Sequence, residues 1–194
     1  MRIVAGEFRG RPLSTPGGDA TRPTAARARE ALFAILADVT GDRVLDLYAG
    51  SGALGLEALS RGAEQLVLVE SSRAAQEAIR SNVLALGVGT RAILLPLRAE
   101  ASMKALERLG PFTLVFADPP WADAQAALAV LETLAGSSLL APAERLVLEH
   151  AACTPPTPKA GARLHAVDTR RWGDTAITIF ELIEAPALAP PSSS

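Results

Sequence analysis

From residue 43 to residue 150 the chain alternates short apolar runs with longer, alanine-rich amphipathic runs, and this alternation limits the folds it can adopt. The short runs are typical of β-strands and the longer runs of α-helices. Strands separated by helix-length connections predict a parallel sheet with helices on both faces. The expected strands lie at 43–48, 65–70, 91–96, 112–117 and 145–150, and the expected helices at 54–61, 72–86, 100–109 and 123–134.

The C-terminal part of the chain departs from this alternation. After the proline-rich segment 154–158, two expected strands at 163–169 and 175–183 follow each other without a helix between them. The short connection at 170–174 predicts a hairpin, so we expect the sheet to end in an antiparallel pair.

The N-terminal part predicts a small extension at 1–40, with a hairpin, a loop and a helix near 25–37. The main domain is expected at 41–184 and a disordered tail, rich in Pro, Ala and Ser, at 185–194. The fold class is therefore α/β, with a mostly parallel sheet and a short N-terminal addition.

Composition excludes several classes of protein. The chain has 194 residues, 49% of them hydrophobic, which is enough to bury a full core. Its single cysteine, Cys153, excludes a disulfide framework, and no Cys/His cluster has the spacing of zinc ligands. No apolar run reaches the ~18 residues of a membrane span, and the start of the chain lacks the apolar segment of a signal peptide. We therefore expect a cytoplasmic monomer without a metal or a membrane partner.

A glycine-rich segment follows the first expected strand and opens the first expected helix. Gly50, Gly52 and Gly55 allow a sharp turn and a close approach to a ligand. Glu70 ends the next strand, where a carboxylate can accept both ribose hydroxyls of a bound nucleotide. A dinucleotide pyrophosphate would be repelled by Asp46 at the start of the loop, whereas the ammonium and sulfonium of S-adenosylmethionine would be attracted. Asp46 therefore favours S-adenosylmethionine, although a loop-capping Asp46 and a solvated Glu70 also fit the sequence.

The fourth expected strand is followed by the tetrapeptide Asp118-Pro119-Pro120-Trp121. The carboxyl ends of strands form the edge at which open α/β sheets bind ligands. A carboxylate and a rigid proline carbonyl form a double acceptor for the two N–H groups of an exocyclic amine, and Trp121 offers a face for base stacking. The alternative is an ordinary turn in which Trp121 only packs.

Together, the two motifs resemble the Rossmann-like S-adenosylmethionine-dependent methyltransferases that act on amino groups. The chain resembles more closely the bacterial family that methylates guanine N2 in small-subunit ribosomal RNA. This resemblance spans roughly residues 2–183 and is carried by the segments 2–6, 9–11, 21–24, 29–33, 45–60 and 173–175, with Arg27. It implies a Rossmann-like sheet and methyl transfer to the 2-amino group of one guanine of 16S rRNA, in a partly assembled 30S particle.

The resemblance also assigns residues to the expected site. Trp121 stands where the family usually has Phe or Tyr, and 97–100 lacks the usual adenine contact, which leaves the backbone of Arg98 and Ala99 as candidates. The candidate catalytic residues are Asp118, Pro119, Pro120 and Trp121. The candidate cofactor-binding residues are Asp46, Tyr48, Gly50, Ser51, Gly52, Glu70, Arg98 and Ala99.

Basic residues are concentrated at the N-terminus, where residues 1–30 hold six arginines and three acidic residues although the whole chain has a net charge of −2. Arginine clusters suit phosphates, so this segment is expected to contact RNA, although a solvated basic face is the simpler alternative. A turn at 170–174 offers a second contact. The candidate RNA-binding residues are Arg9, Arg11, Arg22, Thr24, Arg27, Arg29 and Arg171.

Three other functions remain compatible with these residues. The same acceptor pair would serve a methyltransferase for adenine N6 in DNA or for another amine. The glycine spacing alone would fit an NAD-dependent oxidoreductase. A non-catalytic RNA-binding or assembly protein would need only the basic cluster.

Overall fold

The structure is a computed structural model that describes residues 1–18 and 23–183. Its strands are β1 (Arg43–Leu47), β2 (Gln65–Val69), β3 (Ala92–Leu95), β4 (Phe112–Ala117), β5 (Leu140–Ala151), β6 (Leu164–Trp172) and β7 (Thr175–Leu182). Its helices are α1 (Pro23–Leu36), α2 (Ala53–Ser60), α3 (Arg73–Leu86), α4 (Met103–Leu106) and α5 (Ala124–Ala135), with 3-10 turns η1 (Pro16–Gly18), η2 (Ala99–Ala101) and η3 (Trp121–Asp123). The expected tail at 185–194 lies outside the described residues.

The strands form one seven-stranded sheet in the order β3-β2-β1-β4-β5-β7-β6. The first five strands of the chain run parallel to one another, and β7 is antiparallel to both β5 and β6. The expectation of a mostly parallel sheet with an antiparallel C-terminal pair is therefore confirmed. Because β2 and β4 lie on opposite sides of β1, the chain reverses direction across the sheet there, and ligands bind at such a point in open α/β folds.

Two elements differ from the expectation. Arg170, Arg171 and Trp172 continue β6, so only Gly173 and Asp174 form the hairpin turn. Gly173 has a φ of +63°, which a two-residue hairpin turn favours. The helix expected at 100–109 is reduced to η2 and the single turn of α4.

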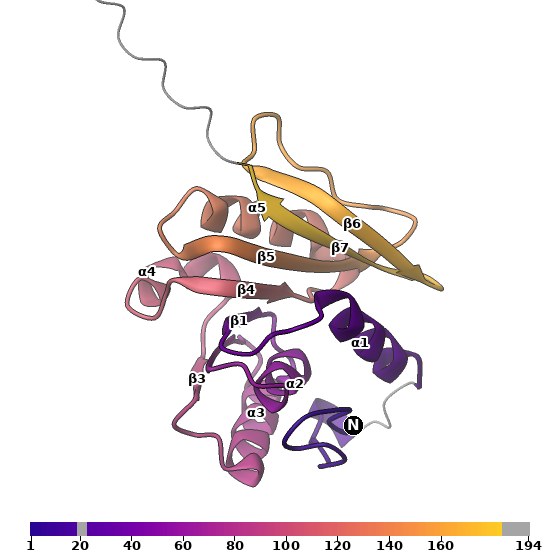
Figure 1. Cartoon of the computed structure of the whole chain (residues 1–194), viewed down its shortest axis with the longest axis vertical. Helices are drawn as coiled ribbons and strands as arrows, with labels where there is room; N and C mark the ends of the chain where they lie inside the picture. Colours follow the sequence, from indigo (N-terminus) through magenta and orange to yellow (C-terminus); the bar gives the residue numbers. More distant parts are fainter. Residues whose placement is uncertain (19–22, 184–194) are drawn as a thin grey trace, which may run out of the picture.

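Helices cover both faces of the sheet (Figure 1). On one face, α1, α2 and α3 share a buried cluster with one set of strand side chains, and on the other face α4 and α5 share a second cluster with the alternate set. Successive strand side chains point to opposite faces, so strands buried on both sides must be apolar almost throughout. The sequence of β2, QLVLV, meets this requirement, and four of its five residues are buried.

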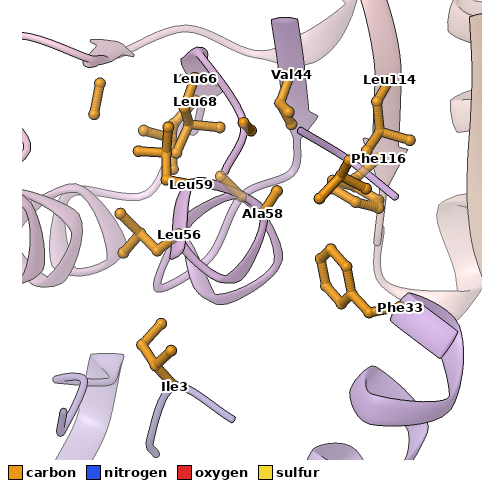
Figure 2. Close-up of a cluster of buried hydrophobic side chains, with 14 of the residues drawn as sticks. Ile3, Phe33, Val44, Leu56, Ala58, Leu59, Leu66, Leu68, Leu114 and Phe116 are labelled. Atoms are coloured by element: carbon orange, nitrogen blue, oxygen red, sulfur yellow. The ribbon is translucent and has the colours of Figure 1, made fainter. Parts of the chain in front are cut away.

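The cluster beneath α1 and α2 joins the N-terminal segment to the sheet (Figure 2). The ring of Phe33, on α1, faces that of Phe116, on β4, with the ring centroids 5.8 Å apart. Ile3 is 2% exposed and belongs to the same cluster. The N-terminal segment thus packs on the same hydrophobic core as the sheet.

Polar contacts with α2 hold the first residues of the chain in place. Glu57 is completely buried, and its carboxylate accepts hydrogen bonds from the backbone N–H groups of Val4 (2.8 Å) and Ala5 (3.0 Å). It also lies 2.9 Å from Arg61 Nε and 3.5 Å from Arg29 Nε. The expected hairpin is reduced to an isolated antiparallel bridge between Arg2 and Pro12, with backbone hydrogen bonds from Ile3 to Arg11 and from Leu13 to Met1. The first residues of the chain are thus held by α2.

Two further findings concern the described residues alone. None of the helices within 23–183 combines the length and the apolar character needed to cross a membrane. In the same part of the chain and in residues 1–18, no three His, Cys, Asp or Glu side chains are grouped as metal ligands would be.

The buried Glu57 generates a stability prediction. We expect Glu57→Gln to lower the free energy of unfolding by about 3–5 kcal/mol, because it leaves the buried Arg29 without its countercharge. The control is Glu64→Gln, at an exposed carboxylate, which should change this free energy by less than about 0.5 kcal/mol. Urea unfolding measures both, and equal effects would contradict the anchoring role of Glu57.

Candidate functional site

A cleft of about 830 Å³ lies at the carboxyl edge of the parallel strands. It is walled by the segments that follow β1, β2, β3 and β4 and by the start of α5. The order of the strands places these segments side by side, on either side of the point where the chain reverses direction. The lining residues are Tyr48, Val69, Glu70, Ser71, Ser72, Leu97, Arg98, Ala99, Glu100, Ala101, Asp118, Pro119, Pro120, Asp123 and Ala126.

The glycine loop turns sharply between β1 and α2. Tyr48, Gly50 and Gly52 have φ values of +57°, +56° and +77°, so three residues in a stretch of five adopt the left-handed conformation. Tyr48 is not a glycine, and such a conformation costs of order 1–3 kcal/mol and is concentrated at functional sites. Its hydroxyl donates a hydrogen bond to Glu100 at 3.0 Å, which ties the loop to the opposite wall of the cleft.

Carboxylates of the protein itself occupy N–H groups of this loop. Glu70 accepts a hydrogen bond from the backbone N–H of Gly50 at 2.8 Å and another from Ser72 at 2.7 Å. Asp46 accepts one from the N–H of Gly55, in the first turn of α2, at 3.0 Å. A dinucleotide would need such N–H groups for its pyrophosphate. Glu70, beside the loop, therefore presents a carboxylate to the cleft where a phosphate-binding loop presents N–H donors.

Asp46 lies beneath the loop and does not line the cleft. It is 1% exposed, and burial, together with the negative charges of Asp118 and Glu70, raises its pKa well above the usual range. Asp46 therefore caps the glycine loop through Gly55, which is the alternative that the sequence also allowed. Gly50, Ser51 and Gly52 likewise shape the loop without lining the cleft.

Asn82, on α3, connects this loop to the N-terminal segment. Its side-chain amide donates to the carbonyl of Ser51 at 2.9 Å and to the carbonyl of Ser14 at 3.0 Å, and it accepts from the N–H of Ser14 at 2.7 Å. Asn82 is 1% exposed, so these bonds are shielded from water. One buried side chain thus holds both the glycine loop and the start of the loop that leads to α1.

The segment after β3 forms the opposite wall. Ala99 is buried, whereas Arg98 is exposed and lies 3.7 Å from Glu100. Both candidates for the adenine contact therefore line the cleft. Burial raises the pKa of Tyr48, so its hydroxyl keeps the proton that it donates to Glu100.

Asp118, Pro119 and Pro120 of the tetrapeptide after β4 line the cleft, whereas Trp121 is not among its lining residues. Asp118 is exposed to solvent at the cleft, and desolvation by the protein around it raises its pKa to about 6. Pro119 is buried and lines the cleft beside it. The carbonyl of Pro120 accepts a hydrogen bond from the N–H of Asp123 at 2.8 Å, which closes η3. Trp121 starts η3 with 49% of its surface exposed, an unusual exposure for so large an apolar side chain.

The charges around the cleft suit a cationic ligand. Four of the described residues that line the cleft carry carboxyl groups: Glu70, Glu100, Asp118 and Asp123. Arg98 is the single basic residue in this described lining. Since Arg98 is paired with Glu100, the field in the cleft is predominantly negative. The residues therefore fit the ammonium and sulfonium groups of S-adenosylmethionine and disfavour a pyrophosphate.

The candidate RNA-binding residues fall into two groups. Arg9, Arg11, Arg27 and Arg171 are exposed, although Arg11 donates to the carbonyl of Ala85 at 2.6 Å and Arg171 to that of Gly173 at 3.0 Å. Arg29 is 5% exposed and bonds to the carbonyl of Arg2 at 2.7 Å, so the structure places it in the core and not on a surface. Arg22 lies outside the described residues, and Thr24 is described only by its position in the first turn of α1.

Several lining residues were not singled out from the sequence. Glu100 and Asp123 lie several residues beyond the ends of β3 and β4, so no regular spacing in the sequence marks them. The order of the strands brings both to the cleft. Ser71 and Ser72 follow Glu70 directly, and their position after β2 is a signal that could have identified them.

The family model for conserved hypothetical protein 95 matches residues 1–181 of the chain. The ribosomal RNA small subunit methyltransferase D of Escherichia coli strain K12 is 41% identical over 122 residues, which is 62% of this chain and 60% of that protein. The matched segment thus spans about three fifths of the length of this curated relative.

Solved structures extend the likeness over more of the chain. A protein from Escherichia coli described as a candidate methyltransferase, yhhF, is 33% identical with a TM-score of 0.76, covering 94% of this chain and 97% of that one. A hypothetical protein from Thermus thermophilus is 32% identical with a TM-score of 0.75, covering 92% of this chain and 98% of that one.

Close packing at the glycine loop generates the next prediction. A Cβ at Gly55 would lie 2.4 Å from Leu66 Cδ1 and 3.0 Å from Asp46 Oδ2. Leu66 is fully buried and cannot move freely, so we expect Gly55→Ala to lower the free energy of unfolding by about 1–3 kcal/mol and to weaken S-adenosylmethionine binding.

The control is Gly89→Ala, because a Cβ there meets open space and the glycine has no positive φ. Urea unfolding and calorimetric titration measure the two effects. If Gly55→Ala behaved like Gly89→Ala in both experiments, the close approach of α2 to β2 would not be a requirement of the site.

Proposed function

The chain belongs to the family of conserved hypothetical protein 95, as a relative of the ribosomal RNA small subunit methyltransferase D proteins, and on this premise we propose that it methylates the 2-amino group of a guanine in 16S ribosomal RNA. The observation that carries the proposal is the acidic cleft that is lined by Asp118, Pro119 and, at the start of the glycine loop, Tyr48. Its methyl donor is S-adenosylmethionine.

The glycine loop and the wall after β2 hold the methyl donor. Glu70 is positioned by the N–H groups of Gly50 and Ser72, and its carboxylate would accept hydrogen bonds from the ribose hydroxyls. Asp46 acts through the loop that it caps. Tyr48, Arg98 and the backbone of Ala99 bound the remainder of the cleft. When bound, S-adenosylmethionine supplies a methyl group made electrophilic by its sulfonium.

The segment after β4 holds the amine that receives the methyl group. The carboxylate of Asp118 and the carbonyl of Pro119 accept hydrogen bonds from its two N–H groups, while Pro120 keeps the segment rigid. Such acceptors reduce delocalisation of the nitrogen lone pair into the ring and make the nitrogen more nucleophilic. Trp121 provides the exposed face on which the unpaired base stacks, a contact worth ~1–3 kcal/mol.

The RNA reaches this edge of the sheet across the N-terminal extension. Arg9, Arg11 and Arg27 are exposed on that part of the molecule and provide phosphate contacts, with Arg171 at the hairpin as a second point. Arg22 and Thr24 stay candidates from the sequence. The RNA is 16S rRNA in a partly assembled 30S particle, and the protein acts as a cytoplasmic monomer.

A transfer assay tests the substrate. Tritiated S-adenosylmethionine is supplied with 30S particles, naked ribosomal RNA or DNA, and we expect label in guanine N2 of the ribosomal RNA. Label confined to DNA would identify the alternative adenine N6 methyltransferase, and the absence of label in all three would exclude the proposed reaction.

Asp118 provides the matching prediction for catalysis. We expect Asp118→Asn to lower kcat about 100-fold or more, since it removes the charged acceptor, while S-adenosylmethionine still binds. In the unaltered protein, kcat/KM should fall as the pH drops through about 6, because the raised pKa of Asp118 means that its carboxylate protonates there. Glu107→Gln, at an exposed carboxylate directly after α4, is the control and should leave both values unchanged.

The exposed arginines Arg9 and Arg27 can be tested as phosphate contacts. We expect the double variant Arg9→Ala with Arg27→Ala to weaken RNA binding and to reduce the slope of log affinity against log salt by about 1 for each lost phosphate contact. Arg108→Ala, at an exposed arginine after α4 on the other face of the sheet, is the control. If neither variant changed the slope, Arg9 and Arg27 would make no phosphate contacts with the RNA.

A further inference from the structure

Glu149 is a carboxyl group near the active edge of the sheet to which the proposed function assigns no role. It lies near the end of β5, whose neighbour in the sheet is β4. Ala117 pairs with Leu148 in this parallel ladder, so Asp118 and Glu149 are the next residues along the two neighbouring chains. The strand register therefore brings a second carboxyl group beside Asp118.

The two carboxyl groups leave the sheet on the same face. Phe116 and Val147 are partners in the ladder, and both belong to the buried cluster beneath α1 and α2. Side chains two residues apart on a strand share a face, which directs Asp118 and Glu149 to that side as well. Glu149 is half-buried, so water screens its charge only in part.

Among the residues that the structure describes, the groups around Glu149 offer it no countercharge. Its partner on β7 is the apolar Ile177. On β6, beyond Ile177, Arg170 is engaged with Asp168 at 2.9 Å, and Arg29 of α1 is engaged with Glu57. On the β1 side, Asp46 adds a further carboxyl group. Among the described residues, none of the ion pairs involves the Glu149 carboxylate.

Two neighbouring carboxyl groups without a cation do not both ionise readily, and one of them keeps a proton. Burial first, and then the negative charge of Asp118, raises the pKa of Glu149 to about 8, whereas that of Asp118 is raised to about 6. As the pH increases, Asp118 therefore ionises first and Glu149 second.

We propose that Glu149 is a positioning residue of the methyl-transfer site: the two neighbouring carboxyl groups hold one proton between them, so that the pair carries a single negative charge, on Asp118, until Glu149 ionises. The proposal rests on the proposed function for its catalytic meaning. Its physical content, the shared proton, concerns the two carboxyl groups alone.

The pair has a defined task in the reaction. The amino nitrogen forms a bond to the methyl carbon, the carbon–sulfur bond breaks with its electron pair on sulfur, and the nitrogen then loses one proton. Asp118 is the base that takes up this proton and passes it to water. A second negative charge at Glu149 favours the positive charge that develops on the nitrogen, so the reaction should become faster as Glu149 ionises.

The shared proton is tested directly by NMR titration of carboxyl groups labelled with ¹³C, in the absence of RNA. The unaltered protein should show coupled steps near pH 6 and pH 8. Glu149→Gln should lose the upper step and keep the lower one, because a neutral amide replaces a neutral acid. Asp118→Asn should move the step of Glu149 below 8, because it removes the neighbouring charge. The proposal is overturned if that step stays at 8 or if Glu149→Gln loses the lower step.

The catalytic meaning is tested by the pH profile of kcat on ribosomal RNA, from mildly acidic to mildly alkaline buffer. At neutral pH Glu149→Gln should retain kcat within about two-fold. Above pH 8 the unaltered protein should gain up to about ten-fold, the factor that corresponds to one pKa unit of coupling, whereas Glu149→Gln should stay level. Glu181→Gln, at an exposed carboxylate of β7, is the control and should follow the unaltered protein.

Identical profiles for Glu149→Gln and the unaltered protein would overturn the positioning role. The two experiments fail independently of each other. If no RNA is methylated but the two coupled steps appear, the proposed function is wrong and the shared proton stands. If RNA is methylated but the steps are uncoupled, the proposed function stands and the shared proton is wrong.

Discussion

The site depends on two hydrogen bonds in which carboxylates of the protein cap the glycine loop, from Gly50 to Glu70 and from Gly55 to Asp46. A loop of this shape between a strand and a helix usually offers its N–H groups to phosphate. Here those N–H groups are occupied, and the charge that faces the cleft is negative. The same backbone turn thereby becomes a site for a cationic ligand, and the identity of the bound molecule follows from electrostatics more than from the spacing of glycines.

A second constraint links the N-terminal extension to this loop. Glu57 fixes the backbone of Val4 and Ala5, and Asn82 bonds both to Ser14 and to Ser51 of the glycine loop. The segment that we propose to meet RNA is therefore built onto the same helices that support the methyl-donor site. The N-terminal extension and the strand that carries Asp118 share one hydrophobic core, because α1 contributes Phe33 to the cluster that contains Phe116 of β4.

The sequence predicted the order and type of most elements, because apolar strands and amphipathic helices have distinct periods. It also predicted the cleft through Tyr48, Glu70 and the tetrapeptide at Asp118, since residues that follow parallel strands meet at one edge. It could not predict that Arg29 is buried, because its partner Glu57 lies on a different helix and only tertiary packing joins them. Glu149 was missed for a similar reason, since its importance arises from the register of β4 and β5.

The central claim is that the cleft accepts a cationic methyl donor and not a dinucleotide. Calorimetric titration of the full chain with S-adenosylmethionine and, separately, with NAD tests this most directly. We expect saturable binding of S-adenosylmethionine that is weakened by Glu70→Ala, and no measurable heat of binding with NAD. Tight binding of NAD, with none of S-adenosylmethionine, would contradict it.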